Sequence, residues 1–232
     1  MYLKGFSIIL PTYNEADNVK ILIPKLVNIW SSQEFNYEII VVDDNSPDGT
    51  AEIARKFAET YPIKVFVRTR RLGLSSAIIY GARKASYDYV IVMDADLQHP
   101  PEKTIDIAYS LSSGCDIVVA SRYISGGGIE GWSRIRLLES KIATYLAYML
   151  LPVTRKTSDP MSGFFGCKRE YLLDPRIKPI GYKILIEIIC LNPSARICDV
   201  PYVFKSRLYG GSKLGSSVIL DYIKQLVYRR FH

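Results

Sequence analysis

The sequence predicts an α/β protein whose mostly parallel central sheet is covered by helices on both faces. Short apolar segments rich in β-branched residues alternate with helix-length segments through the first half of the chain. Continuous apolar strands between helices are typical of parallel sheets buried on both sides. The chain has 232 residues, 48% of them hydrophobic and 23% charged, which supports a large core and excludes a disordered protein.

Five strands are expected in the first half of the chain. They lie at residues 6–10, 38–42, 63–67, 89–93 and 116–120. Each strand is followed by a polar or Gly/Pro loop and then by a segment long enough for a helix. This alternation is the pattern of successive parallel strands joined by crossover helices.

The second half has a different pattern. It predicts a flexible glycine loop at 126–128, a helix over 132–151, a turn-rich loop over 159–166, a short helix over 181–191 and a strand over 197–204. A closing amphipathic helix over 217–231 places one apolar stripe on Ile219, Tyr222, Ile223, Leu226 and Val227. No linker or repeat interrupts the chain, so we expect a single domain over 1–232.

Charge and cysteine content narrow the function classes. The formal net charge of +7 favours an anionic partner, which leaves nucleic acid, a phosphorylated small molecule and an acidic membrane surface open. The four cysteines have no C-x-x-C spacing, which argues against a zinc or redox site, and we expect reduced thiols in the cytosol. Residues 1–5 show no signal-peptide pattern, and the longest apolar run, 142–151, would cover only about 15 Å, so no membrane crossing is expected.

Polar side chains gather where the predicted strands end. They occupy 11–15 after the first strand, 43–46 after the second, 94–100 after the fourth and 121–123 after the fifth. A single acid at a strand end is usually a helix cap or turn residue. Four such ends, carrying acids, an arginine and a tyrosine, indicate a ligand site in the crevice beyond the carboxyl ends of the strands.

A metal site is predicted inside this crevice. Asp94 and Asp96 are two residues apart at a strand end, and Gln98 occupies the next alternate position. Two carboxylates and an amide oxygen are ligands that suit Mg²⁺ or Mn²⁺, which keep positions open for substrate phosphates. We expect His99 to be a loop residue near the metal and not a ligand. The segment 126–131 matches G-x-G-x-x-G but lacks the strand-to-helix context of a dinucleotide site.

These segments also carry a resemblance to a known family. Together, the segments 11–15 (Pro-Thr-Tyr-Asn-Glu), 43–44, 94–98 (Asp-Ala-Asp-Leu-Gln) and 121–123 resemble family-two glycosyltransferases of the GT-A fold. The later segments 126–128, Trp132, Arg136, Ser140, 159–165 and 210–215 are similar to dolichol-phosphate mannosyltransferases. The resemblance extends from residue 6 to residue 215.

The resemblance implies inverting, metal-dependent transfer of mannose from GDP-mannose to dolichyl or another polyprenyl phosphate. It implies a nucleotide-sugar-binding half at 1–125 and an acceptor-binding, membrane-interface half at 126–232. Carried over by position, the donor-binding residues are Pro11, Tyr13, Glu15, Val42, Asp44, Asp94, Ala95, Asp96, Gln98, Arg122, Lys183, Arg207 and Lys213. The metal ligands are Asp94, Asp96 and Gln98. The acceptor phosphate contacts Arg122, Arg136 and Ser140, and the catalytic residues are Asp96, Arg122 and Arg136.

The chain departs from the family pattern at two places. Arg134 and Ile135 replace the usual residues before Arg136, and Gly211 stands where a glutamate is common before Ser212 and Lys213. The Q-x-x-R-W string of processive synthases is absent, as expected for a single transfer. Because a phosphate monoester is already ionised at neutral pH, we expect no dedicated catalytic base.

The sequence leaves a few alternatives open. The segment 201–232 has six Lys or Arg residues and one Asp, which suits either an anionic membrane surface or a solvated helix face. If the basic segment meets a membrane, the resemblance implies a peripheral enzyme on the cytoplasmic face of that membrane. A membrane-anchoring partner subunit is a further possibility that the sequence leaves open. Glu187 pairs with an internal cation or orients the donor sugar. One rival function is the same transfer from a UDP-sugar, and another is a lipid-phosphate binder without catalytic activity. A third is a nucleic-acid-binding module, against which the sequence shows no recognisable groove or motif of basic and aromatic residues.

Overall fold

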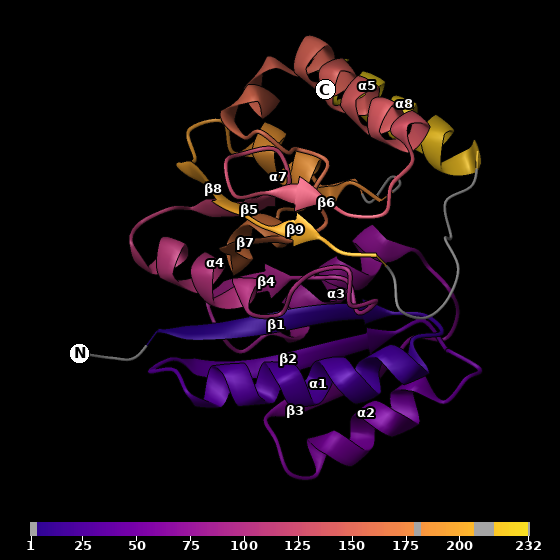
Figure 1. The fold of residues 1–232 in the computed structure, drawn as a ribbon, viewed down its shortest axis with the longest axis vertical. Helices are drawn as coiled ribbons and strands as arrows, with labels where there is room; N and C mark the ends of the chain where they lie inside the picture. Colours follow the sequence, from indigo (N-terminus) through magenta and orange to yellow (C-terminus); the bar gives the residue numbers. More distant parts are fainter. Residues whose placement is uncertain (1–3, 179–181, 207–215, 232) are drawn as a thin grey trace.

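The computed structural model describes residues 4–178, 182–206 and 216–231, with the side chains of 216–219 left out. Its centre is a seven-stranded sheet with strand order β3-β2-β1-β4-β7-β5-β8 (Figure 1). The strands are β1 (Gly5–Thr12), β2 (Asn36–Asp43), β3 (Ile63–Val67), β4 (Tyr89–Val92), β5 (Ile117–Ser121), β7 (Phe165–Lys168) and β8 (Ile197–Pro201). All neighbouring pairs are parallel except those made by β7. The predicted fold class is confirmed.

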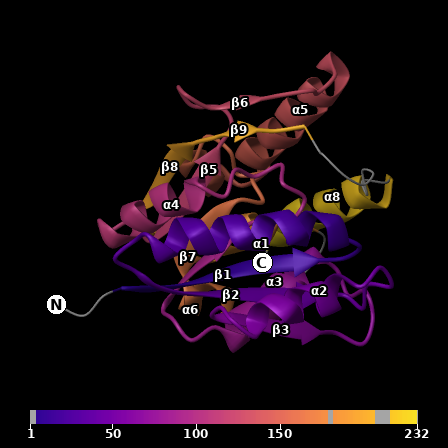
Figure 2. The same cartoon turned by 60° about the horizontal axis from the view of Figure 1, so that its bottom comes forward.

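Helices cover both faces of the sheet (Figure 2). One face packs on α1 (Ala16–Ser31), α2 (Thr50–Ala58) and α4 (Lys103–Ser112). The other face packs on α3 (Leu74–Lys84), α6 (Arg169–Leu172) and α7 (Ile184–Leu191). Alternate residues of β1 enter the two cores, since Ile8 packs with α1 and Ile9 packs with α3. The two-sided burial explains why the strands read as unbroken apolar runs.

Two predictions in the second half need correction. The loop expected over 159–166 contains the start of β7, which lies antiparallel between β4 and β5. The strand was missed because it has only four residues and one of them is Gly166, so its sequence pattern is weak. Glycine is needed there because a Cβ at Gly166 would lie 2.4 Å from Ile107 on α4. The single strand expected over 197–204 is divided, because the chain leaves the sheet after Pro201 and forms β9 (Val203–Phe204), which pairs with β6 (Gly128–Ile129).

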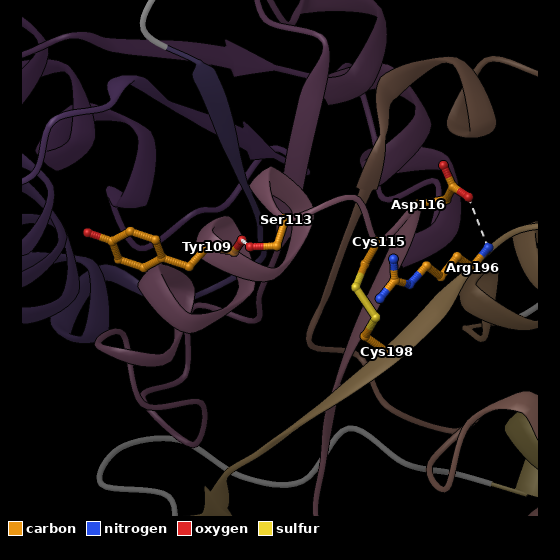
Figure 3. Close-up of a disulfide and its surroundings, with 6 residues drawn as sticks. All are labelled: Tyr109, Ser113, Cys115, Asp116, Arg196 and Cys198. Carbon is orange, nitrogen blue, oxygen red and sulfur yellow. Dashed lines mark hydrogen bonds between the residues drawn. A yellow bond between two sulfur atoms is a disulfide. The ribbon is translucent and has the colours of Figure 1, made fainter.

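The expectation of four reduced cysteines is wrong. Cys115 and Cys198 form a disulfide with a Cα–Cα distance of 6.1 Å across 83 residues of sequence (Figure 3). Cys115 lies just before β5, and Cys198 lies in the neighbouring strand β8. The same two segments are joined by a hydrogen bond from the backbone N–H of Arg196, just before β8, to the carboxylate of Asp116. Among the described residues, Cys167 and Cys190 are free. Burial raises the pKa of both thiols, that of Cys190 to about 12, so both stay protonated.

A further layer lies against α7 and consists of α5 (Arg134–Leu150), the short helix η1 (Pro152–Lys156) and α8 (Ser216–Phe231) (Figure 1). The Tyr222 hydroxyl donates to the carbonyl of Ala143 at 2.6 Å, and Leu226 is buried beside Ala147. In the predicted stripe, Tyr222 and Leu226 are buried, whereas Ile223 and Val227 are exposed. No helix in the described part of the chain has the length and apolarity needed to cross a bilayer.

Glu187 anchors this layer. Its buried carboxylate accepts hydrogen bonds from Gln225 Nε2 at 3.0 Å and from Arg229 Nε at 2.7 Å, and Arg229 also pairs with it through Nη2. Of the two roles left open, the structure assigns Glu187 to an internal ion pair between α7 and α8. Removing one partner of a buried pair leaves an uncompensated charge, so this contact ties α8 firmly to the fold.

Candidate active site

A cavity of about 290 Å³ opens beyond the carboxyl ends of the parallel strands. The predicted residues that line it are Pro11, Tyr13, Glu15, Asp44, Asp94, Ala95, Asp96, Gln98, Arg122, Arg136 and Lys183. They come from both halves of the sequence, and the strand-end rule explains the convergence of all of them except Arg136 on α5 and Lys183 just before α7. The crevice predicted from the sequence is therefore present, with carboxylates and cations on its walls.

Two predicted residues lie elsewhere, and two more fall outside the described part of the chain. Val42 is fully buried in the core that packs on α3, so its side chain does not line the cavity. Ser140 lies one turn of α5 beyond Arg136 and hydrogen-bonds the Tyr123 hydroxyl at 2.9 Å. Arg207 and Lys213 lie outside the described residues.

The carboxylate segment after β4 is fixed by its backbone. Leu97 adopts a positive φ of 62°, and the backbone N–H of Gln98 donates to Asp96 Oδ1 at 3.1 Å. Gln98 Nε2 donates to the carbonyl of Lys205 at 3.0 Å, and the Lys205 N–H donates back to the Gln98 carbonyl. A Cβ at Gly163 would lie 3.4 Å from Asp94 Oδ2, so the opposite wall approaches closely.

This donor set fits a hard divalent cation. Two carboxylates and an amide whose nitrogen is committed to Lys205 offer oxygen ligands, which Mg²⁺ and Mn²⁺ prefer. Within residues 4–178, 182–206 and 216–231, no cluster of three or more His, Cys, Asp and Glu side chains could hold a metal. Asp94, Asp96 and Gln98 would supply only part of the six-oxygen shell that Mg²⁺ takes, which leaves room for substrate oxygens.

His99 supports the carboxylate segment from behind. Its ring stacks on Phe164 with centroids 4.9 Å apart, and its Nδ1 accepts a hydrogen bond from the backbone N–H of Asp94 at 3.1 Å. Burial, with the nearby Arg122 and Lys183 charges, lowers the pKa of His99 to about 4 despite Asp96. The ring is thus neutral at neutral pH and positions Asp94, in agreement with its prediction as a loop residue.

Arg122 is held by Asp159, a partner that the pattern of strand ends did not reveal. The guanidinium Nε and Nη2 donate to the two Asp159 carboxylate oxygens at 2.7 and 2.8 Å. Burial alone lowers the pKa of Arg122, but the hydrogen bonds and charge of Asp159 outweigh it and hold the pKa above its ordinary value. The pair lies 37 residues apart in sequence, and only the turn composition of 159–166 hinted at a structured loop.

A second buried ion pair holds Asp44 at the cavity wall. Asp44 accepts from Arg68 Nε at 2.5 Å and from the backbone N–H of Leu72 at 3.2 Å. These bonds fold the loop before α3 and bring the Arg71 guanidinium 4.7 Å from the ring centroid of Tyr13. Arg71 lines the cavity but was not predicted; the cationic run after the third strand was its only sequence signal.

Lys183 supplies a half-buried cation on the cavity wall. Its Nζ donates to the carbonyl of Met161 at 2.7 Å. Burial and, next, the positive charge of Arg122 lower the pKa of Lys183 to about 8. At neutral pH the side chain is mostly charged and would attract an anionic group.

Known proteins match both the sequence and the fold. The family model "Glycosyl transferase family 2" matches residues 7–174. A dolichol-phosphate mannosyltransferase of Pyrococcus furiosus is 44% identical over 95% of this chain, which spans 62% of that relative's length. A dolichol-phosphate mannosyltransferase of Saccharomyces cerevisiae is 39% identical, with 95% of this chain and 85% of the relative covered.

The structural comparison supports the same fold. Glucosyl-3-phosphoglycerate synthase from Mycobacterium tuberculosis, crystallised with Mn²⁺, uridine diphosphate and glucosyl-3-phosphoglycerate, superposes with a TM-score of 0.74. The match covers 98% of this chain and 80% of that chain at 20% sequence identity, so it establishes the fold alone. The GT-A fold expected from the sequence resemblance is confirmed.

Proposed function

The chain belongs to glycosyl transferase family 2, and we propose that it transfers mannose from GDP-mannose to dolichyl or another polyprenyl phosphate with inversion at the sugar carbon. The products are dolichyl phosphate mannose and GDP. The observation that carries the proposal is the cavity beyond the strand ends, which brings Asp94, Asp96 and Gln98 together with Arg122, Arg136 and Lys183. An anionic donor and an anionic acceptor both need such a mixed site.

The donor side needs charge neutralisation. Asp94, Asp96 and Gln98 would hold Mg²⁺ or Mn²⁺, which when bound stabilises the negative charge of the leaving diphosphate. Lys183 would bind the diphosphate directly as a second positive charge. Tyr13 and Arg71 occupy the end of the cavity near Asp44 and would contact the nucleoside.

The acceptor side needs positioning. The bond from a phosphate oxygen to the sugar carbon forms on the face opposite the departing GDP, as the carbon–oxygen bond to the diphosphate breaks. Since the attacking oxygen is already ionised, with a second pKa of about 6, no base is required. The Arg136 guanidinium lies 4.2 Å from the Trp132 ring centroid, which orients it for the phosphate, and Asp159 fixes Arg122.

We also propose that residues 1–232 act as one catalytic domain. Residues 1–125 would bind the nucleotide sugar, and residues 126–232 would bind the acceptor and meet the membrane. The position of β7 between β4 and β5 supports this unity, because one sheet contains strands of both halves.

The donor is tested by incubating the protein with radiolabelled GDP-mannose, Mn²⁺ and dolichyl phosphate and counting label extracted into organic solvent. Transfer from GDP-mannose, with tighter binding of GDP than UDP in a thermal-shift titration, is the expected result. UDP-glucose and UDP-N-acetylglucosamine serve as competing donors. A lipid product from a UDP-sugar alone would replace the donor assignment with the UDP-sugar alternative.

The pH dependence of donor binding should report Lys183. The pKa of about 8 means that this side chain loses its positive charge as the pH rises through that value. We expect the affinity for GDP-mannose to fall across this pH range in calorimetric titrations. Lys183→Gln should bind the donor weakly at every pH and lack this transition. A wild-type affinity that stays constant up to pH 9, about one unit above that pKa, would remove the charged role of Lys183.

We further propose that the protein is peripheral on the cytoplasmic face of a membrane, where the Cys115–Cys198 disulfide would be exceptional, as in the disulfide-rich intracellular proteins of hyperthermophiles. The outer faces of α5 and α8 expose Ile135, Leu138, Ile142, Tyr145, Met149, Leu220, Ile223, Val227 and Phe231. Cations at Arg134, Lys141, Lys224 and Arg230 flank these side chains on the same two helices. An exposed apolar face flanked by cations suits an anionic bilayer surface.

Vesicle sedimentation tests the membrane proposal. We expect binding to vesicles containing phosphatidylserine and at least tenfold weaker binding for Leu138→Asp combined with Ile223→Asp, because burial of each apolar side chain is worth about 1.5–3 kcal/mol. Tyr61→Asp, at an exposed apolar residue next to β3, is the matched control. If the double variant binds these vesicles as strongly as the Tyr61→Asp control, direct lipid contact is contradicted and a membrane-anchoring partner subunit is favoured.

A further inference from the structure

A second cavity lies beneath α5 and shares none of the residues that line the first. Its volume is about 240 Å³, and its walls are Tyr123, Lys141, Thr144, Tyr145, Tyr148 and Ser158. Three aromatic rings dominate the lining, and Lys141 is the only charged residue among them. Such a surface suits an apolar ligand better than a second phosphate group.

Tyr123 lines the second cavity and follows Arg122, a residue of the first, in the sequence. The Arg122 guanidinium, which lines the first cavity, lies 5.3 Å from the Tyr123 ring centroid. The Tyr123 hydroxyl hydrogen-bonds Ser140 at 2.9 Å. Ser140, to which the resemblance assigns the acceptor phosphate, therefore bonds directly to a tyrosine that lines the second cavity.

One face of α5 connects the two cavities. Arg136, Ser140, Thr144 and Tyr148 are spaced by four residues, so each lies about 6 Å further along the helix axis than the last and is turned from it by about 40°. Arg136 lines the first cavity, whereas Thr144 and Tyr148 line the second. Ser140 lies between them on the helix and lines neither cavity, and the four positions on successive turns are called the α5 track below.

We propose that the second cavity binds the first isoprene units of the polyprenyl acceptor. This inference rests on the proposed function, because it takes the acceptor phosphate to lie at Arg136 and Ser140. The chain would pass Tyr123, enter the cavity beside Thr144 and leave it past Tyr145. The Tyr145 side chain is 65% exposed and belongs to the outer apolar face of α5. The route carries the lipid from the reacting phosphate to the proposed membrane surface.

The track explains how a polyprenyl phosphate would be distinguished from soluble phosphates. The phosphate contacts alone would accept any monoester. Burial of a branched hydrocarbon against aromatic rings adds affinity only for an acceptor with a prenyl chain. Tyr148 is fixed for this purpose, because its hydroxyl donates to the Thr157 carbonyl at 2.9 Å.

The experiment compares geranyl phosphate with methyl phosphate as soluble acceptors. Wild-type protein should show a lower KM for geranyl phosphate. Thr144→Phe, which fills the cavity, should raise that KM about tenfold and leave the KM values of methyl phosphate and GDP-mannose unchanged. Tyr145→Ala is a second variant at an exposed position and should raise the geranyl phosphate KM severalfold. Tyr109→Ala, at a similarly exposed tyrosine on α4, is the matched control.

Calorimetric titration of geranyl phosphate in the presence of GDP separates this inference from the proposed function. Binding that both variants weaken supports the cavity assignment even if no mannose is transferred. Wild-type preference for geranyl over methyl phosphate in both folded variants would overturn it. Absence of geranyl phosphate binding to the wild type would overturn it as well.

Discussion

Asp96→Ala is expected to abolish mannose transfer, with kcat reduced by about a thousandfold or more. Asp96 is buried to 7% exposure on the cavity wall, beside Asp94 and Gln98. Its carboxylate would supply one of two charged metal ligands, and a loss of several kcal/mol of charge stabilisation corresponds to about three powers of ten in rate. The assay is extraction of labelled lipid product at saturating GDP-mannose and Mn²⁺.

Two controls keep this test specific. Asp106→Ala removes an exposed carboxylate that pairs with Lys103 on α4, so it should retain full activity. Asp96→Asn keeps the volume and an acceptor for the Gln98 N–H, and it should be nearly as inactive while unfolding at the wild-type temperature. Chelation should silence the wild type, and Mn²⁺ should restore it. Normal turnover of Asp96→Asn would show that the carboxylate holds no essential cation.

The sequence was most informative where function follows from local position. Asp94, Asp96 and Gln98 follow directly after a buried strand, and the carboxyl ends of parallel strands meet at one crevice. Those two facts are enough to predict that these side chains gather there, and the cavity contains all three. Alternating apolar and helical segments predicted the sheet for the same reason, since strand and helix periods are read within a few residues.

What could not be predicted depends on contacts between distant segments. The Arg122–Asp159 pair joins residues 37 positions apart and exists only because the loop before β7 returns to the end of β5. Sequence reading left Glu187 between two roles, since its partner Arg229 lies on a helix whose docking no local pattern fixes. The insertion of β7 and the disulfide have the same origin, since both depend on which strands become neighbours.

Loss of the Cys115–Cys198 disulfide is expected to destabilise the protein more than most single substitutions. The bond closes a loop of 83 residues, and restricting the unfolded chain to this extent corresponds to about 4.5 kcal/mol at 25 °C. The double variant Cys115→Ser with Cys198→Ser should therefore unfold roughly 10 °C or more below the wild type in calorimetry. Cys190→Ser, at a free and half-buried thiol, should unfold near the wild-type temperature.

The disulfide should also affect the active site, because it secures the edge strand that supports it. Asp199 follows Cys198 in β8 and accepts hydrogen bonds from Thr157 Oγ1 at 2.6 Å and Ser158 N at 2.8 Å, next to Asp159. Thiol titration of the denatured wild type should find two free thiols, and reductant should lower both its unfolding temperature and its transfer rate above about 40 °C. Four titratable thiols, or an unfolding temperature unaffected by reductant, would show that β8 holds Asp199 in place without the covalent link.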